Sequence, residues 1–438
     1  MVSYIAKRLL YSIPTLLLVS VLAFGLSRLT QADPTAAMLT LQGVEPGTST
    51  YEQAYANLYT RESRDKPAFY LSLRPHYVTT DIHSLVDPRQ RAFVQALIER
   101  RYSSDYALQL WTALSATTPT LELSADQLAR WMSTADMESM RSGSLPAGEQ
   151  LTGLIEAAAK HQHSRHYPTL TWHGLDCQYH HWVSKLLAGD MGVSKVDGRS
   201  TASKIGTALR WTLLLLVLNI LITLALSVPY GLYTGLHIGS RFDRWTGSIL
   251  FAIYSMPTFW LATVMILFFT TREFGLQLFP SVGIWYQGSD TTFWQMMGRQ
   301  WPMLILPLTI LVVKDIAYLG RMIRDTVAKE ATKPYATAAL AKGVHPRQYA
   351  YRHILPNALG PAITLAAGAI PAALGGSLLI EVIFNIPGMG RLMYTSITGA
   401  DWAVVFPIVL LTAVVTICWF LIGDVLIALL NPKVTLDD

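Results

Sequence analysis

Six long apolar runs dominate this chain and restrict what it can fold into. They cover residues 9–29, 211–236, 248–270, 301–319, 358–384 and 402–430. A helix needs about 20 apolar residues to cross the hydrocarbon core of a bilayer, where the backbone must satisfy its own hydrogen bonds. Because 51% of the residues are hydrophobic and only 14% are charged, the sequence predicts an all-α membrane protein with six transmembrane helices.

The basic residues of the short loops predict the orientation of these helices, because Lys and Arg beside a span resist translocation. The loops on one side hold only Arg272, Arg299 and Arg391. The loops and ends on the other side hold Lys7, Arg8, Arg241, Arg244, Arg321, Arg324, Lys329, Lys333, Lys342, Arg347, Arg352 and Lys433. We therefore expect both termini in the cytoplasm and the basic loops close to anionic membrane lipid.

The first apolar run has an alternative interpretation as a cleaved secretory signal, with Lys7 and Arg8 as its charged region. We favour a retained helix because the run is longer than a typical signal core. Arg28 also lies where a cleavage site requires small neutral residues. The predicted organisation is a first helix (1–30), an external insert (31–200), helices 2–4 (201–322), a cytoplasmic loop (323–357) and helices 5–6 with the tail (358–438).

The insert is expected to be a mostly α domain outside the membrane. Apolar residues recur at helical spacing at Val94, Leu97 and Ile98, and again in the segments 128–135 and 151–158. About 170 residues can enclose a modest core. The two cysteines, Cys177 in the insert and Cys418 in the last span, are not expected to pair.

Eight of the eleven histidines lie in the insert, and imidazole is a common ligand of metal ions. The candidate ligands are His161, His163 and His166. Their spacing matches no zinc-finger pattern, and a structural site needs about four convergent ligands. We therefore expect a polar surface without a metal ion.

Motifs for catalysis are absent from the sequence. It has no phosphate-binding loop of the form G-x-x-x-x-G-K-[ST], no H-E-x-x-H and no G-x-S-x-G. No basic stripe interleaved with aromatics suggests nucleic acid. The sequence therefore predicts a protein that is not an enzyme and that holds no cofactor of its own.

The polar loop 323–357 carries the pattern of a short exposed helix. Lys333 and Pro334 can open it, alanines at 336, 338, 339 and 341 give it a small-residue surface, and Gly343 can end it. Small side chains let another backbone approach closely. The loop therefore predicts either a helix that docks on a partner or an amphipathic segment on the bilayer surface, and docking is favoured.

Several motifs together resemble the permease subunits of the dipeptide, oligopeptide and nickel group of ABC importers. They stand at residues 6–10 (AKRLL), 189–194 (GDMGVS), 254–260 (YSMPTFW), 339–343 (ALAKG), 352–358 (RHILPNA), 380–384 (IEVIF), 387–390 (PGMG) and 431–433 (NPK). The resemblance covers about 1–30 and 185–436, so the insert exceeds the external segment usual for the group. Thr337 and His353 depart from the general importer pattern.

This resemblance implies a permease of the bacterial inner membrane that forms the path of an ATP-driven peptide importer. The implied partners are a homologous second permease, two cytoplasmic ATPases that bind ATP and Mg²⁺, and an external solute-binding protein. The loop would then be the coupling helix, with the ATPase-coupling residues Pro334, Tyr335, Ala338, Ala339, Lys342 and Gly343. The insert would enlarge the dock for the binding protein or partly cover the entrance.

Charged residues inside the spans are candidates either for the pathway or for structural pairing, because an intramembrane charge costs roughly 2.5 to 3.5 kcal/mol on insertion scales. They are Lys314, Asp315, Glu381 and Asp424. Two other functions remain open at this point: import of nickel or a metal chelate, which the histidines favour, and a noncatalytic membrane sensor or scaffold.

Overall fold

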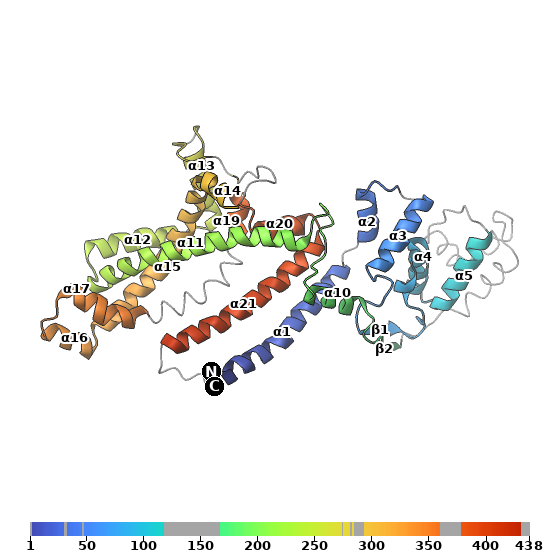
Figure 1. Ribbon diagram of the computed structural model, residues 1–438, viewed down its shortest axis with the longest axis horizontal. Helices are drawn as coiled ribbons and strands as arrows, with labels where there is room; N and C mark the ends of the chain where they lie inside the picture. The colour runs from blue at the N-terminus through green and yellow to red at the C-terminus, as the bar shows by residue number, and fades with distance from the viewer. Residues whose placement is uncertain are drawn as a thin grey trace. The chain divides into compact units, whose positions relative to one another are not determined.

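The computed structural model describes residues 2–29, 33–45, 48–117, 167–273, 275–280, 283, 293–359 and 378–430. Contacts divide the chain into two compact units. The membrane unit comprises Met1–Ser27 and Met191–Asp438, and the insert unit comprises Arg28–Asp190. The described part of both units is mostly helical (Figure 1).

The insert unit contains five described helices and one small sheet. Asp33, Thr48 and Asp87 cap three of the helices by accepting a hydrogen bond from a backbone N–H of the first turn. The elements are α2 (Pro34–Leu41), α3 (Ser49–Arg61), β1 (Leu71–Pro75), the 3₁₀ turn η1 (Ile82–Ser84), α4 (Pro88–Glu99), α5 (Ser104–Thr117), β2 (Pro168–Trp172) and α10 (Gln178–Leu187).

Two apolar clusters pack the helices α2 to α5 of the insert unit in pairs. Tyr51, Tyr55 and Tyr59 repeat every four residues on α3 and pack with Leu39 of α2. The second cluster joins α4 to α5 through residues that include Val94 and Leu97, both predicted at helical spacing. The helical segments expected at 128–135 and 151–158 lie outside the described residues, as do His161, His163 and His166.

The sheet of the insert unit was not predicted. β1 and β2 pair antiparallel, with Leu71 opposite Trp172 and Leu73 opposite Leu170. About 90 residues separate the two strands in the sequence, and each strand is only five residues long. Short-range periodicity does not reveal such a pairing, because the partner is far away along the chain.

The membrane unit is built around the long helices α11 (Thr201–Leu236) and α15 (Pro302–Ala331), which lie side by side in Figure 1. Gly231 and Gly235 of α11 make this approach possible, since a Cβ at either position would come within 2.7 Å of Ile323 or Val327 on α15. The other elements are α1 (Val2–Leu29), α12 (Arg241–Ser255), α13 (Thr258–Thr270), α14 (Phe293–Gln300), α16 (Pro334–Ala341), α17 (Pro346–Gln348), the π-helix η2 (Tyr349–Ile354), α19 (Leu378–Ile383), α20 (Met389–Thr398) and α21 (Trp402–Leu430).

Within the described residues, four helices are long and apolar enough to cross a membrane, or five if one bent pair counts as a span. The four are Leu10–Arg28, Thr201–Leu236, Pro302–Ala331 and Trp402–Ile422. Most of the predicted span 358–384 lies outside the described residues, because 360–377 are not described. The count of six therefore stays a prediction.

The predicted span 248–270 is not one continuous helix. It divides into the end of α12 and all of α13, which meet at an angle of 102°. Pro257 causes the break because it lacks a backbone N–H and its ring clashes with the preceding turn. In the sequence this proline lies within an apolar run, and the length of the run alone suggested a single crossing.

Candidate functional site

The short helix α16 has one buried side and one exposed side. Ala336, which is 0% exposed, and Ala339 pack against Ile323 and Val327 of α15 and against Ile354 of η2. Because alanine is small, α16 lies close to these neighbours. The inner side of α16 is therefore fixed to the membrane unit.

A glycine ends α16 in the way that the sequence suggested. Gly343 has a φ of +73°, in the left-handed region that favours glycine. The Gly343 N–H donates to the carbonyl of Leu340, and the Val344 N–H donates to that of Ala339. This pair of bonds is a Schellman motif, and Val344 also packs against the cluster below α16.

Glu330, at the end of α15, fixes the beginning of α16. Its carboxylate accepts hydrogen bonds from Tyr335 Oη at 2.7 Å and from Lys333 Nζ at 2.6 Å. Burial, and then the hydrogen bond to Glu330, raise the pKa of Tyr335 to about 12. Asn357 Nδ2 donates to the same hydroxyl at 3.3 Å. Sequence reasoning missed Glu330, although its spacing of three residues from Lys333 is a helical contact distance.

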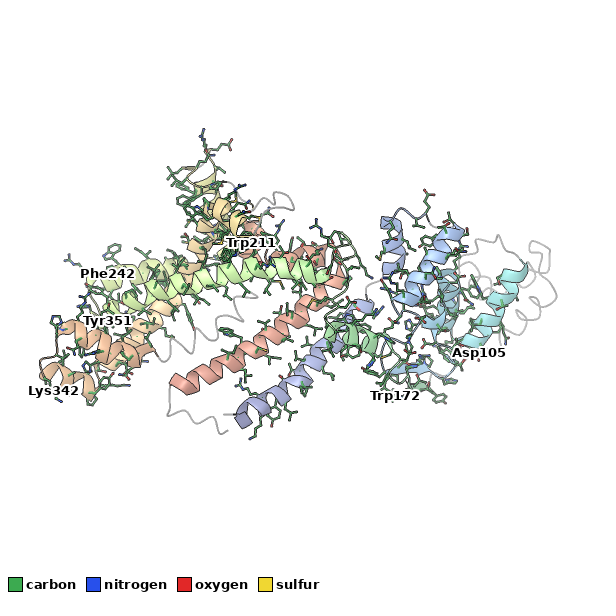
Figure 2. The ribbon with its side chains drawn as sticks, viewed as in Figure 1. Asp105, Trp172, Trp211, Phe242, Lys342 and Tyr351 are labelled. Atoms are coloured by element: carbon green, nitrogen blue, oxygen red, sulfur yellow. The ribbon has the colours of Figure 1, made fainter. Side chains whose placement is uncertain are left out.

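The outer side of α16 presents the remaining predicted residues. Pro334, Ala338 and Lys342 are exposed, and Leu340 exposes half of its surface. The basic residues Arg347 and Arg352 are exposed on the segments that follow. Figure 2 places Lys342 and Tyr351 together at this end of the membrane unit, whereas Trp211 lies away from it. Ala338 and Leu340 thus form a small apolar strip that is surrounded by basic side chains.

An ion pair ties this end of α15 to the neighbouring helix. Arg324 donates to both carboxylate oxygens of Asp243 in the first turn of α12, at 2.5 and 2.7 Å. Such a two-point contact is geometrically specific. Asp243 also accepts from the Gly239 N–H at 2.9 Å. No local pattern could predict this pair, because 81 residues separate its members.

Lys314 and Asp315, the adjacent charges in the fourth predicted span, contact different neighbours. Lys314 Nζ donates to the carbonyl of Met256 at 2.7 Å and to Thr258 Oγ1 at 3.0 Å, at the bend between α12 and α13. Asp315 accepts from Asn219 Nδ2 of α11 at 2.6 Å. Lys314 therefore bonds a backbone carbonyl at the proline break.

Glu381 belongs to α19 and is completely buried, and its carboxylate lies against the beginning of α20. Its carboxylate accepts from Thr212 Oγ1 at 2.8 Å and from the backbone N–H groups of Gly390 and Arg391 at 2.6 and 3.1 Å. These N–H groups belong to the first turn of α20, where a helix favours a negative charge. The side chain of Asp424 lies outside the described residues.

A second buried acid, Asp401, receives the segment that contains the GDMGVS motif. Ser194 Oγ donates to Asp401 at 2.5 Å, and the Lys195 N–H donates at 3.1 Å. Lys204 lies 3.7 Å from Asp401 and 3.0 Å from Asp197. Burial raises the pKa of the Asp197 carboxyl, but hydrogen bonds from Lys204 and Ser194 outweigh it and lower that pKa to about 2. Sequence reasoning did not identify Asp401.

The described histidines of the insert unit form no metal site. No group of three or more His, Cys, Asp or Glu side chains suited to a metal ion occurs among the residues that the structure describes. His173 contacts Ser72 and Arg74, and His181 contacts Asp176. Cys177 is buried and Cys418 is exposed, and both are free thiols.

Comparison with known proteins shows the family of the chain. Residues 227–436 match the binding-protein-dependent transport system inner membrane component. The oligopeptide transport system permease protein AppB of Bacillus subtilis is 30% identical over 258 residues, which are 59% of this chain and 79% of that protein. The chain belongs to this family.

Two further relatives show a similar extent of match. The metal-staphylopine import system permease protein CntB of Staphylococcus aureus is 27% identical, over 58% of this chain and 76% of that protein. The glutathione transport system permease protein GsiC of Escherichia coli is 28% identical, over 59% of this chain and 78% of that protein. This permease is therefore a multi-pass inner-membrane component of a transport system, as the resemblance in its sequence indicated.

Proposed function

We propose that this permease forms the translocation path of an ATP-driven peptide importer and that α16 receives the motion of a cytoplasmic ATPase. The observation that carries the coupling role is the two-sided construction of α16. Its inner side is packed on α15 and η2, and its outer side is open. A force applied to the outer side passes directly to the long helix α15, because Glu330 of α15 holds the beginning of α16 and Val344 packs into the cluster beneath its end.

The chemistry of the outer side suits a partner with an apolar groove and an acidic rim. Leu340 and Ala338 supply the apolar contact, and Lys342, Arg347 and Arg352 supply positive charge around it. A helix laid in a groove is a common mode of recognition, and complementary charge fixes its orientation. In the proposed assembly, the other chains are a homologous second permease, two ATPases that bind ATP and Mg²⁺, and an external solute-binding protein.

Peptides are the proposed substrate class because relatives are named for oligopeptide and glutathione transport. The second candidate is a metal chelate, which the name of the metal-staphylopine permease favours. The orientation proposed from the basic residues places α16 and both termini in the cytoplasm and the insert unit outside. The test is ATP-driven uptake by the complex in proteoliposomes. Uptake of a labelled oligopeptide indicates a peptide importer, uptake of a metal chelate indicates a metal importer, and uptake of neither indicates a sensor or scaffold.

The coupling role is tested by Leu340→Glu, which adds a charge at the centre of the apolar strip. We expect peptide uptake to fall by about tenfold or more and less ATPase to copurify, because an unpaired charge in an interface is strongly unfavourable. Ile397→Glu on α20 is the matched control, since Ile397 is 45% exposed and Leu340 is 50% exposed. The control should retain the ATPase. Equal copurification and normal uptake with Leu340→Glu would refute the coupling role.

A further inference from the structure

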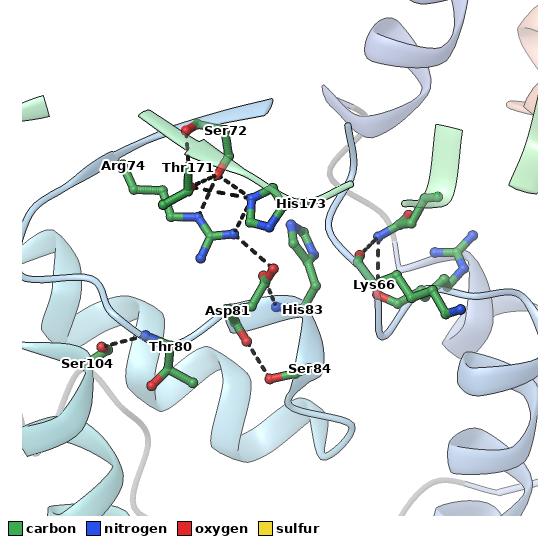
Figure 3. Close-up of polar contacts among 12 residues, drawn as sticks. Lys66, Ser72, Arg74, Thr80, Asp81, His83, Ser84, Ser104, Thr171 and His173 are labelled. Atoms are coloured by element: carbon green, nitrogen blue, oxygen red, sulfur yellow. Dashed lines mark hydrogen bonds and ion pairs between the residues drawn. The ribbon is translucent and has the colours of Figure 1, made fainter. Parts of the chain in front are cut away.

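The small sheet of the insert unit exposes its apolar face, whereas the polar side chains of β1 on the other face are partly buried. Leu71, Leu73, Leu170 and Trp172 share one face, and Leu73 and Trp172 expose 71% and 66% of their surface. Ser72, Arg74 and Thr171 share the other face, where Arg74 donates to Asp81 at 2.8 Å (Figure 3). A two-layer domain normally buries the apolar face of a sheet, so this inversion indicates a missing partner.

The polar face is held rigidly. Ser72 Oγ lies 2.8 Å from Thr171 Oγ1 and 2.7 Å from His173 Nε2, and Arg74 Nε donates to Ser72 Oγ at 2.8 Å. These contacts tie both strands to the turn at Asp81, as Figure 3 shows. The strands are therefore positioned before any ligand arrives, which lowers the entropy lost on binding.

The outer edge of β1 has backbone groups available for pairing. The His173 N–H donates to the Tyr70 carbonyl, and the His76 N–H donates to the Tyr167 carbonyl. Because hydrogen-bonded pairs alternate in an antiparallel ladder, Ser72 and Arg74 must also bond β2. The N–H and C=O groups of Leu71 and Leu73 then point away from β2, and no third strand pairs with this edge in the described part of the chain.

A cavity of about 380 Å³ lies along this same edge. All five residues of β1 line it and no residue of β2 does, while Val78, Ile82 and Ile98 are among the residues that complete its wall. This volume falls within the range of small-ligand pockets, roughly 300 to 1,000 Å³. The cavity thus lies directly beside the open edge of β1.

We propose that β1 binds an extended peptide, which adds to the sheet as a third strand in this cavity. The inference rests on the proposed function, because it takes the captured peptide to be the transported substrate. The backbone of the peptide would bond Leu71 and Leu73. Alternate side chains would continue the apolar face beside Leu73, and the others would enter the polar wall near Arg74 and Asp81. The edge favours extended peptides with apolar residues at every second position.

The test measures binding of a fluorescein-labelled Val-Thr-Val-Thr-Val-Thr peptide to the full chain in nanodiscs, by fluorescence anisotropy. Leu73→Pro removes an N–H on the open edge and leaves the β1–β2 ladder intact, because proline is tolerated where the N–H points outward. Leu170→Pro, directly across the sheet, makes the same change on the opposite edge. We expect Leu73→Pro to weaken binding by tenfold or more and Leu170→Pro to change it less than twofold.

Amide hydrogen exchange at Ser72 and Arg74 shows whether each variant keeps the ladder. If Leu73→Pro disturbs the ladder, the proposal is tested on the unaltered protein with peptides that carry N-methyl groups at alternate positions. One N-methyl register should abolish binding and the other should retain it. Equal effects of the two prolines with an intact ladder, equal binding of both N-methyl registers, or no peptide binding would overturn the proposal.

Further outcomes distinguish peptide binding at β1 from binding of the solute-binding protein and from the proposed function. Binding of the external solute-binding protein that depends on Leu73, without peptide binding, would assign the edge to that partner and overturn the peptide proposal. ATP-driven peptide uptake that is unchanged by Leu73→Pro would overturn the role of the edge in transport and leave the proposed function standing. Failure of all peptide uptake by the complex, with edge binding retained, would refute the proposed function instead.

Discussion

Glu381 and Asp401 are both buried in the membrane unit and accept hydrogen bonds from backbone N–H groups. Glu381 accepts from the first turn of α20, and Asp401 accepts from the N–H of Lys195 and the hydroxyl of Ser194. A buried carboxylate is tolerated when several donors satisfy it. These contacts favour structural pairing over substrate contact for Glu381, which the sequence left as an open alternative.

The Glu381 interpretation predicts a stability effect. Glu381→Ala leaves the N–H groups of Gly390 and Arg391 and the hydroxyl of Thr212 without this acceptor, so we expect a loss of about 2 to 4 kcal/mol in the free energy of unfolding. Glu381→Gln keeps one carboxamide oxygen and should lose less. Thermal unfolding in detergent measures both. A normal melting temperature combined with abolished uptake would instead make Glu381 a pathway residue.

At the scale of elements, α16 shows how far a sequence pattern can predict a site. Its start at Pro334 and its end before Gly343 are local features, and the structure has them. The division of the alanines is not local. Ala336 and Ala339 face α15 while Ala338 faces out, because the position of α15 decides which side of the helix is covered.

Other elements could not be predicted for the same reason. The break at Pro257 is stabilised by Lys314, which donates to the carbonyl of Met256, 58 residues away along the chain. The β1–β2 pairing and the Arg324–Asp243 ion pair also join distant segments. Periodicity and capping report contacts within about one helical turn, so they identified most long helices and missed the contacts that orient them.

The end of α16 gives a prediction at this scale. Gly343→Ala places a Cβ in a left-handed conformation, which costs about 1 kcal/mol or more, whereas Asn tolerates it better. We expect amide exchange of α16 to increase and peptide uptake to fall in the Ala variant, with a smaller effect for Gly343→Asn. The expectation fails if both variants exchange and transport like the unaltered protein, since the Schellman ending would then have no mechanical role.

At the scale of the whole molecule, the five apolar clusters of the described residues each lie within one unit. Three belong to the membrane unit and two to the insert unit. The contacts of Glu381, Asp401 and α16 likewise stay within the membrane unit. Each unit therefore has the internal packing that a separate domain needs.

Replacing residues 33–187 by a long Gly/Ser linker tests this division and the role of the insert together. The linker removes both clusters of the insert unit and keeps Ser194 and Lys195, which Asp401 requires. We expect the membrane unit to retain its melting temperature and its ATPase, because its own clusters are untouched. Uptake of extended apolar peptides should fall at low concentration, where capture by β1 matters most, and recover in part at high concentration. Full uptake at every concentration would exclude the insert from transport, and an unfolded membrane unit would show that the two units depend on each other.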